Sequence, residues 1–338
     1  MGKALSVYFH SSQMPNALHS ELGQALAQRA VPPKFNYITH RQAARWWKVH
    51  QTYAPLATQK MQQSWFSDFF ASVSNTFVRH HRESIGLISL GCGAGNKDAL
   101  LLQKTYQSDA KFKYYHAFDV SASLTLTAGA TAADVANKYG HELAVTRSVG
   151  DLMKVDALED LGDVPHAHAR CFLLLGMIPN MQPVETLDKV RTWMKEKDRL
   201  IISTNLVHSD DLQQGIEGIL AQYDNDLTRL WLWTFMEDMG VAADKDSIVF
   251  SIEYRKHSGI DYARIRADLF FEHDITLTYE GNQYDFIQGD KLNLFYSNRF
   301  TKSGFERLLK NQKMRVEDED ASIYENGEEG LWLIKPEL

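Results

Sequence analysis

Three glycines in one short loop carry the strongest chemical signal in the sequence. The segment Ile88-Ser-Leu-Gly91-Cys-Gly93-Ala-Gly95-Asn-Lys97 follows an apolar run typical of a buried strand and opens a stretch with helical periodicity. Glycine lets a backbone turn tightly and approach a ligand, and the first N–H groups of a helix bind anions because they have no partner within it. The pattern indicates a nucleoside-binding loop, with a purely structural turn as the alternative.

A carboxylate follows at the expected distance. Asp119 ends the next predicted strand, 24 residues beyond Gly95. An acidic side chain at this point accepts hydrogen bonds from a ribose diol in nucleotide-binding folds of this kind. The alternative role for Asp119 is capping the following helix, but Ser121 competes for that position. Loop and carboxylate together favour nucleoside binding over plain turn chemistry.

The spacing of the loop distinguishes between nucleoside cofactors. A dinucleotide fingerprint requires a third glycine where this chain has Asn96, which disfavours an NAD-linked dehydrogenase. The observed spacing resembles the loop with which class I methyltransferases bind S-adenosylmethionine. Gly150, Asp151 and Leu152 resemble the adenine-binding loop of those enzymes. One departure is Ser89, because many methyltransferases carry an acidic residue there that binds the methionine amino group.

Strands and helices alternate around these residues. Apolar runs predict strands at residues 85–90, 113–120, 143–148, 169–175 and 199–203, separated by helices, and this order is typical of a parallel sheet covered on both faces. One helical face is predicted over 212–223. Alternating residues then predict antiparallel strands at 248–254, 262–271, 275–279 and 291–296. The acidic run 317–329 is predicted to be a solvated loop before a last strand at 331–335.

The whole chain resembles the histidine-specific methyltransferase family, whose members trimethylate histidine in ergothioneine biosynthesis. The matches are short, but they occur in the right order over about 300 residues. They comprise Pro32-Pro33-Lys34-Phe35-Asn36-Tyr37, Gly91 to Lys97 with Leu100-Leu101-Leu102, Met177-Ile178-Pro179-Asn180, Ser203 to Val207, Tyr223-Asp224, and Leu292 to Phe300 followed by Gly304-Phe305.

This resemblance implies roles for individual residues. It implies that Asn180 and Tyr223 hold the amino-acid backbone of the acceptor, with Tyr37 and Ser297 as further contacts. It also implies that Tyr53 lies near the cofactor. Lys97 is in position to face the methionine carboxylate, with a solvated lysine as the alternative.

Phe295 is the important departure from the family. The family has a glutamate there that binds the imidazole of histidine, and phenylalanine accepts no hydrogen bond. Losing a buried charged partner weakens binding strongly. We therefore expect an acceptor other than histidine, with an apolar or aromatic group at this place.

The resemblance also implies an architecture. We expect an α/β fold in which a Rossmann-like, seven-stranded class I methyltransferase sheet is formed by residues 62–205 plus 300–338. A smaller α+β substrate lobe is expected from residues 1–61 plus 206–299. The active site is expected between them, at the carboxyl ends of the strands.

Composition excludes several other classes. The 338 residues are 44% hydrophobic and carry a formal charge of −7, so nucleic-acid and anionic-membrane partners are not expected. Cys92 and Cys171 are too few for a disulfide framework, and the first residues lack a secretory apolar core, so a cytoplasmic location is expected. The paired histidines His80-His81 and His166-Ala-His168 lack further ligands nearby, so no metal is expected.

These inferences predict an S-adenosylmethionine-dependent methyltransferase that acts on the amine nitrogen of a small molecule, an amino acid or derivative other than histidine. Two alternatives remain open. One is methylation of an oxygen or carbon atom of a small metabolite. The other is a non-catalytic subunit that retains the fold, which Ser89 and Phe295 motivate.

Overall fold

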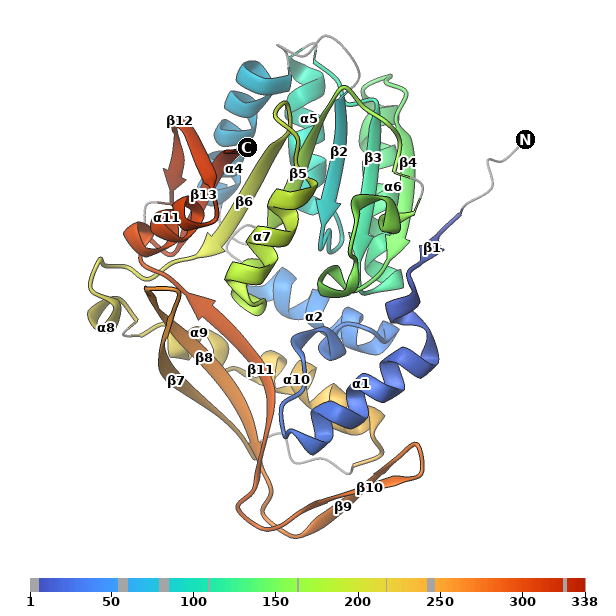
Figure 1. The fold of residues 1–338 in the computed structure, drawn as a ribbon, viewed down its shortest axis with the longest axis vertical. Coiled ribbons are helices and arrows are strands. Elements are labelled where there is room, and N and C mark those ends of the chain that lie inside the picture. Colours follow the sequence, from blue (N-terminus) through green and yellow to red (C-terminus); the bar gives the residue numbers. More distant parts are fainter. Residues whose placement is uncertain are drawn as a thin grey trace.

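The computed structural model describes residues 6–53, 60–78, 85–108, 110–162, 164–216, 218–241, 247–324 and 327–337, without the side chains of 318–322. Two parts are visible in Figure 1: a large sheet covered by helices, and a smaller antiparallel sheet with its own helices. No helix in the described ranges is long and apolar enough to cross a membrane.

The large sheet has eight strands in the order β1-β4-β3-β2-β5-β6-β13-β12. The five central strands are parallel, whereas β13 runs antiparallel to β6 and β12 antiparallel to β13. Seven of these form the predicted class I methyltransferase sheet, and β1 adds an eighth by pairing parallel to β4. The strands are β1 (Tyr8–Phe9), β2 (Ile85–Leu90), β3 (Tyr114–Asp119), β4 (Ala144–Val149), β5 (Ala169–Leu175), β6 (Arg199–Asn205), β12 (Met314–Ile323) and β13 (Glu329–Pro336).

Helices cover both faces of this sheet. Alternate residues of β5 point to opposite cores, because successive side chains of a strand face opposite sides. Cys171 and Leu173 pack toward α4 (Lys60–Val73), α5 (Asn96–Gln107) and α6 (Ala122–Lys138). Phe172 and Leu174 pack toward α7 (Pro183–Trp193) and α11 (Lys302–Asn311). A fully apolar strand therefore follows from burial on both faces.

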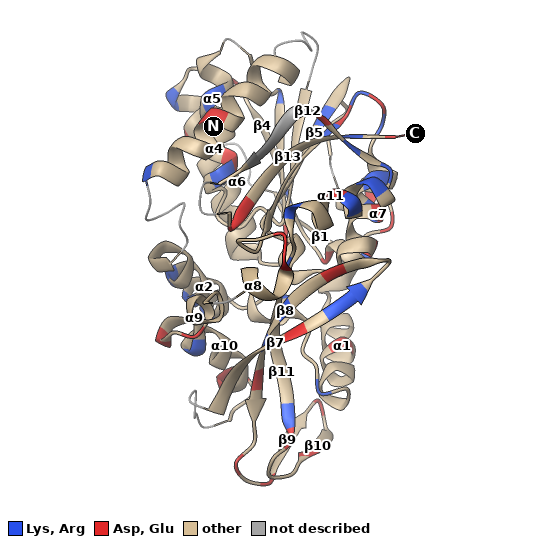
Figure 2. Ribbon diagram, turned by 90° about the vertical axis from the view of Figure 1, so that its left-hand side faces the viewer, with Lys and Arg blue, Asp and Glu red and all other residues tan. Residues whose placement is uncertain are grey.

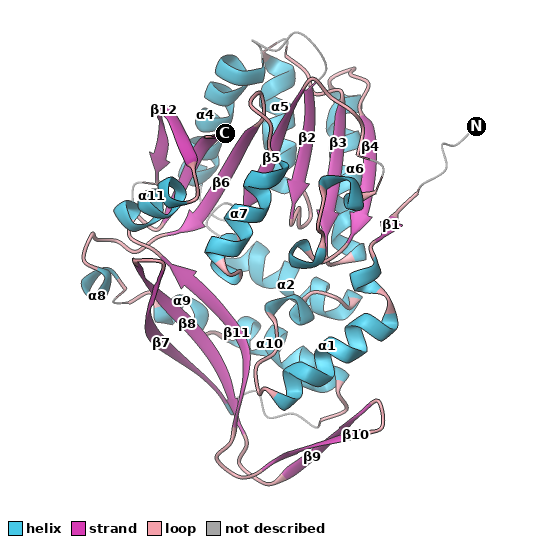
Figure 3. Cartoon of the chain, in the orientation of Figure 1, coloured by secondary structure: helices cyan, strands magenta, loops and turns pink. Residues whose placement is uncertain are grey.

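The smaller lobe is built around β8 (Ile260–Phe270), which pairs antiparallel with β7 (Ile248–His257) and β11 (Lys291–Arg299). Its core joins this sheet to α1 (Pro15–Ala27), α10 (Asp226–Asp238) and the hairpin of β9 (Ile275–Tyr279) and β10 (Asn282–Phe286). In Figure 2 the lobe has α10 and α2 (His40–Tyr53) on one side and α1 on the other. The N-terminal segment and the 206–299 region therefore share one core (Figure 3).

Two predictions about local structure were wrong. The acidic run is not a loop, because β12 covers most of it and β13 begins at Glu329. As the last strand of the sheet, β12 has one open edge, where charged residues are tolerated. The helix expected over 212–223 is two short helices, α8 (Leu212–Gly215) and α9 (Leu220–Tyr223). Gly218, with φ of +79°, interrupts them.

Candidate active site

The glycine loop joins the end of β2 to the start of α5. Gly91, Gly93 and Gly95 have φ values of +69°, +52° and +79°, a region that side chains with a Cβ rarely adopt. The N–H of Gly91 donates to the carbonyl of Phe118 at the end of β3, over 2.8 Å. The loop is thereby fixed against the neighbouring strand.

The three glycines have different neighbours, so the lack of a Cβ has a different effect at each position. A Cβ at Gly95 would lie 2.9 Å from Cα of Ala128, so this glycine is required for packing of α5 against α6. A Cβ at Gly91 would collide with the side chain of Met177, whereas one at Gly93 would lie 3.3 Å from Cη2 of Trp46. Gly91 and Gly93 thus contact the ends of side chains and no backbone, so a ligand could reach the loop here once Met177 and Trp46 change rotamer.

Asp119 lies at the edge of this loop. Its Oδ2 accepts the N–H of Gly93 at 3.0 Å, and its Oδ1 accepts the N–H of Ser121 at 2.9 Å. The residue is 8% exposed, and burial raises the pKa of its carboxyl to about 6, against the lowering effect of the backbone hydrogen bonds. Ser121 caps α6, so capping that helix is not the role of the Asp119 carboxylate. A carboxylate accepts about four hydrogen bonds, so Asp119 has capacity for a ribose diol.

The loop after β4 is held by the N-terminal segment. Oδ2 of Asp151 accepts from Nζ of Lys34 at 2.7 Å, and Lys34 also pairs with Glu21 at 2.6 Å. Ser12 Oγ accepts the N–H of Asp151 at 3.0 Å. A Cβ at Gly150 would lie 2.8 Å from the ring of Phe118, and Leu152 belongs to the buried core. The role of Lys34 was missed from the sequence, although it lies within the segment that carries the family resemblance.

Lys97 is not solvated. Its Nζ lies 3.0 Å from Oε1 of Glu329 and 4.6 Å from the centre of the Phe66 ring. The ammonium group is therefore at the carboxyl edge of the sheet, but it is paired with a carboxylate that sequence reasoning did not identify.

A cluster of hydroxyl groups lies beyond the glycine loop. Oη of Tyr223 is 2.9 Å from Oγ of Ser297, and Nε of Arg299 donates to the same Oη at 3.4 Å. Burial, with the nearby charges of Asp119 and Tyr223, raises the pKa of Tyr37. The structure thus places Tyr37 within electrostatic reach of both Tyr223 and Asp119, and Tyr223 in contact with Ser297.

Aromatic rings form the wall next to these hydroxyls. The ring centre of Tyr37 lies 5.7 Å from that of Trp46 and 5.3 Å from that of Trp231. Trp231 in turn lies 5.4 Å from Phe295. The row runs from the glycine loop, where Trp46 covers Gly93, to the position at which the family has its glutamate. Its members pack in or against the core of the smaller lobe.

Asn180 is held in the structure by a side-chain hydrogen bond, whereas Tyr53 lies on the surface. Nδ2 of Asn180 donates to the carbonyl of Tyr296 at 2.7 Å, which ties the turn after β5 to β11. The N-cap of α7 is Gln182, so Asn180 does not cap that helix. Tyr53 ends α2 and is 46% exposed. In the described part of the chain, no hydrogen bond or ring contact joins Tyr53 to the glycine loop.

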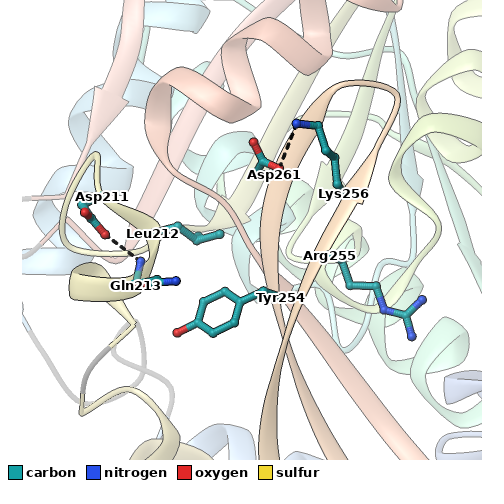
Figure 4. Close-up of a pocket in the computed structure, with 7 residues that line it drawn as sticks. All are labelled: Asp211, Leu212, Gln213, Tyr254, Arg255, Lys256 and Asp261. Atoms are coloured by element: carbon teal, nitrogen blue, oxygen red, sulfur yellow. Dashed lines mark hydrogen bonds and ion pairs between the residues drawn. The ribbon is translucent and has the colours of Figure 1, made fainter.

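An open cleft of about 440 Å³ lies elsewhere, between α8 and the turn of β7 and β8 (Figure 4). Tyr254, Lys256 and Asp261 line it, and Lys256 pairs with Asp261. It contains none of the predicted site residues.

His80 and His81 lie outside the described residues, within which no three His, Cys, Asp or Glu side chains form a metal-binding group.

Solved structures with similar folds are remote in sequence. An S-adenosylmethionine-dependent methyltransferase from Clostridium acetobutylicum is 14% identical, with 86% of this chain and 98% of that chain covered and a TM-score of 0.44. Magnesium protoporphyrin IX methyltransferase from Synechocystis is 11% identical, with 90% and 97% covered and a TM-score of 0.43. No curated protein matches the chain in sequence.

The family model of the histidine-specific, S-adenosylmethionine-dependent methyltransferases matches residues 67–322, about three quarters of the chain. This match covers the glycine loop, Asp119, Tyr223, Ser297 and the strand that carries Phe295, but not Tyr37. The resemblance noted in the sequence is thereby confirmed, and S-adenosylmethionine is the cofactor of this fold. The chain belongs to the family of histidine-specific, S-adenosylmethionine-dependent methyltransferases.

Proposed function

We propose that this methyltransferase acts on the amine nitrogen of a small molecule that carries a carboxylate, an amino acid or derivative other than histidine. In this proposal residues 62–205 plus 300–338 hold the methyl donor. Residues 1–61 plus 206–299 form the lobe that holds the acceptor. The observation that carries the proposal is the environment of Arg299.

Arg299 is a buried cation without a carboxylate partner. It is 5% exposed, and its hydrogen bonds go to three neutral oxygens: Oη of Tyr223, the carbonyl of Leu206 and Oε1 of Gln222. Among the described residues no Asp or Glu pairs with it. Burying a charge without a counter-ion is costly. An acceptor carboxylate bound at the Tyr223–Ser297 pair would supply the missing negative charge.

The remaining residues suit a neutral amine. Because Nδ2 of Asn180 is held by the Tyr296 carbonyl, Oδ1 is the atom it offers to an N–H of the acceptor. Burial and nearby negative charge raise the pKa of Tyr37, so its hydroxyl stays protonated and can donate a hydrogen bond to the acceptor. Trp231 and Phe295 are buried, and in this proposal the aromatic row keeps water away from the bound acceptor. Holding reactants in line contributes roughly 7–11 kcal/mol to such a reaction.

S-adenosylmethionine supplies a methyl group already activated by its sulfonium. Gly91, Gly93 and Asp119 would hold its nucleoside part, since only side-chain ends cover these two glycines and Asp119 has unused acceptor capacity. The chain's own contribution is therefore alignment of the acceptor and exclusion of water.

Phe295 determines which acceptors are refused. It is buried against Trp231, so no carboxylate stands where the family binds an imidazole. A buried polar group without a partner costs about 1–3 kcal/mol. Histidine is therefore disfavoured, and an acceptor with an aromatic or apolar side chain is the better chemical match to these rings.

The test is a paired acceptor panel with isotopically labelled S-adenosylmethionine. L-Phenylalanine, L-tryptophan, L-leucine and L-histidine are each compared with the amine formed by removing the carboxylate. We expect methylation of an aromatic or apolar amino acid, at least tenfold less with its amine, and little with histidine. NMR locates the new methyl group. A methyl on oxygen or carbon, or equal turnover of the amines, contradicts the proposal.

A further inference from the structure

Three side chains from three elements form a polar cluster that the acceptor site does not use. Nζ of Lys97, in the first turn of α5, lies 3.0 Å from Oε1 of Glu329 at the start of β13. Oε2 of Glu329 accepts from Nε2 of Gln62 on α4 at 2.7 Å. Such a cluster could have a purely structural role, holding the helices on the sheet. Its position and its unused hydrogen-bonding atoms distinguish that role from ligand binding.

The cluster lies at the carboxyl edge of the sheet, beside the glycine loop. Nζ of Lys97 would be 3.9 Å from a Cβ on Gly176, the residue that follows β5. The next residue, Met177, is the one that lies over Gly91. Glu329 pairs with Asn205 at the carboxyl end of β6. Ligands of open α/β sheets bind at this edge.

Each member of the cluster has unused hydrogen-bonding capacity. Gln62 is 1% exposed, and its Oε1 is buried with no hydrogen-bond partner. Leaving such an acceptor unpaired costs about 1–3 kcal/mol. The Glu329 carboxylate uses two of about four acceptor sites, and the Lys97 ammonium has three donors. An unpaired acceptor beside a carboxylate fits a donor with several N–H groups.

The position that usually supplies such an acid does not do so here. Ser89 replaces it, and Ser89 is buried and hydrogen-bonded to Asp98. Asp98 is itself bound by Oη of Tyr115 at 2.5 Å. Neither side chain is available to a cation above the glycine loop.

We propose that Glu329 and Oε1 of Gln62 bind the α-ammonium of the amino-acid end of S-adenosylmethionine, with Lys97 facing its carboxylate. The negative charge lost at Ser89 on β2 is thus provided from β13. This inference rests on the cofactor and not on the identity of the acceptor, and it is tested without any acceptor present.

The experiment measures by calorimetry the affinity of three ligands for wild type, Glu329→Gln and Lys97→Met. S-Adenosylhomocysteine has both charged groups, its decarboxylated thioether keeps only the ammonium, and 5′-methylthioadenosine has neither. In Glu329→Gln we expect the first two to bind roughly 10- to 100-fold more weakly, the range for a hydrogen bond to a charged group, with methylthioadenosine unchanged. In Lys97→Met only S-adenosylhomocysteine should weaken.

Two variants complete the design. Glu317→Gln removes a 2.7 Å ion pair with Arg199 on the same sheet and should change none of the affinities. Gln62→Leu removes the unpaired oxygen without removing a charge, and it should weaken only the ammonium-bearing ligands. Two results would overturn the proposal. One is that Glu329→Gln weakens methylthioadenosine as much as S-adenosylhomocysteine, which would show a purely structural role for Glu329. The other is that S-adenosylhomocysteine binds Glu329→Gln as tightly as wild type, or more tightly. A wrong acceptor class would leave all these affinities as predicted.

Discussion

The backbone N–H of Gly93 donates a 3.0 Å hydrogen bond to Oδ2 of Asp119. This bond joins the loop after β2 to the end of β3, and it holds a buried carboxylate beside the glycine over which Trp46 lies. The Asp119 carboxylate is therefore held in place at the loop that we propose as the nucleoside site, and this proposal has measurable consequences.

Cofactor affinity should depend on pH through Asp119. Burial raises the pKa of this carboxyl to about 6, so it is mostly protonated at pH 5 and ionised at pH 7. Because the ionised form accepts ribose hydroxyls, S-adenosylhomocysteine should bind about tenfold more weakly at pH 5 than at pH 7. Asp119→Ala should bind weakly at both values, without this step. Calorimetry across pH 5 to 7 checks both; an equal step in the variant assigns the titration to another group.

Gly95 and Gly93 should separate stability from binding. Gly95→Ala combines a left-handed backbone with a Cβ 2.9 Å from Ala128, so it should lower the free energy of unfolding by about 2–4 kcal/mol. Gly93→Ala meets only the end of Trp46 and should cost about 1–2 kcal/mol. Urea unfolding measures both. We expect Gly93→Ala to bind S-adenosylhomocysteine poorly while folded, and retained affinity in this variant would contradict its place at the ligand.

Lys34 should stabilise the N-terminal segment on the sheet. Its largely buried ammonium lies within 2.7 Å of carboxylates of both Glu21 and Asp151. Lys34→Met leaves the two acids without their cation, and we expect a loss of about 2–4 kcal/mol in the free energy of unfolding. The exposed pair of Lys302 and Glu306 provides the matched comparison, since Lys302→Met should cost less than about 1 kcal/mol. Equal effects of the two variants would mean that Lys34 is merely a surface charge.

Tyr223 should act on the acceptor alone. Its hydroxyl bonds to Ser297 and accepts the N–H of Arg299 Nε, at the place where we propose that the acceptor binds. Tyr223→Phe should raise the acceptor KM roughly 10- to 100-fold, with kcat changed much less and S-adenosylhomocysteine affinity unchanged. Arg299→Lys should retain more acceptor affinity than Arg299→Met. A loss of cofactor affinity in Tyr223→Phe would mean that this hydroxyl acts on the cofactor, which contradicts the prediction.

Much of the fold follows from local patterns. Strands buried on both faces, such as Ala169–Leu175, are continuous apolar runs, and their ends are visible in the sequence. The edges are not. Tyr8–Phe9 is too short to give a pattern, and the charged residues of Met314–Ile323 resemble a loop because an edge strand needs only one paired side.

The site follows the same division. Gly91, Gly93 and Asp119 could be predicted because loop chemistry and spacing lie within one βαβ unit. The partners that complete it could not, because they meet only in the folded chain. Lys34 reaches Asp151 across 117 residues, and Lys97 reaches Glu329 across 232. No local pattern records such pairs.

The most direct test is a crystal structure of the chain grown with S-adenosylhomocysteine. We predict the ribose hydroxyls on the Asp119 carboxylate, the nucleoside against Gly91 and Gly93, and the Met177 and Trp46 side chains moved from their positions over these glycines. A nucleoside bound in the cleft beside Tyr254, or anywhere that leaves Asp119 without contact, would contradict the glycine loop as the methyl-donor site.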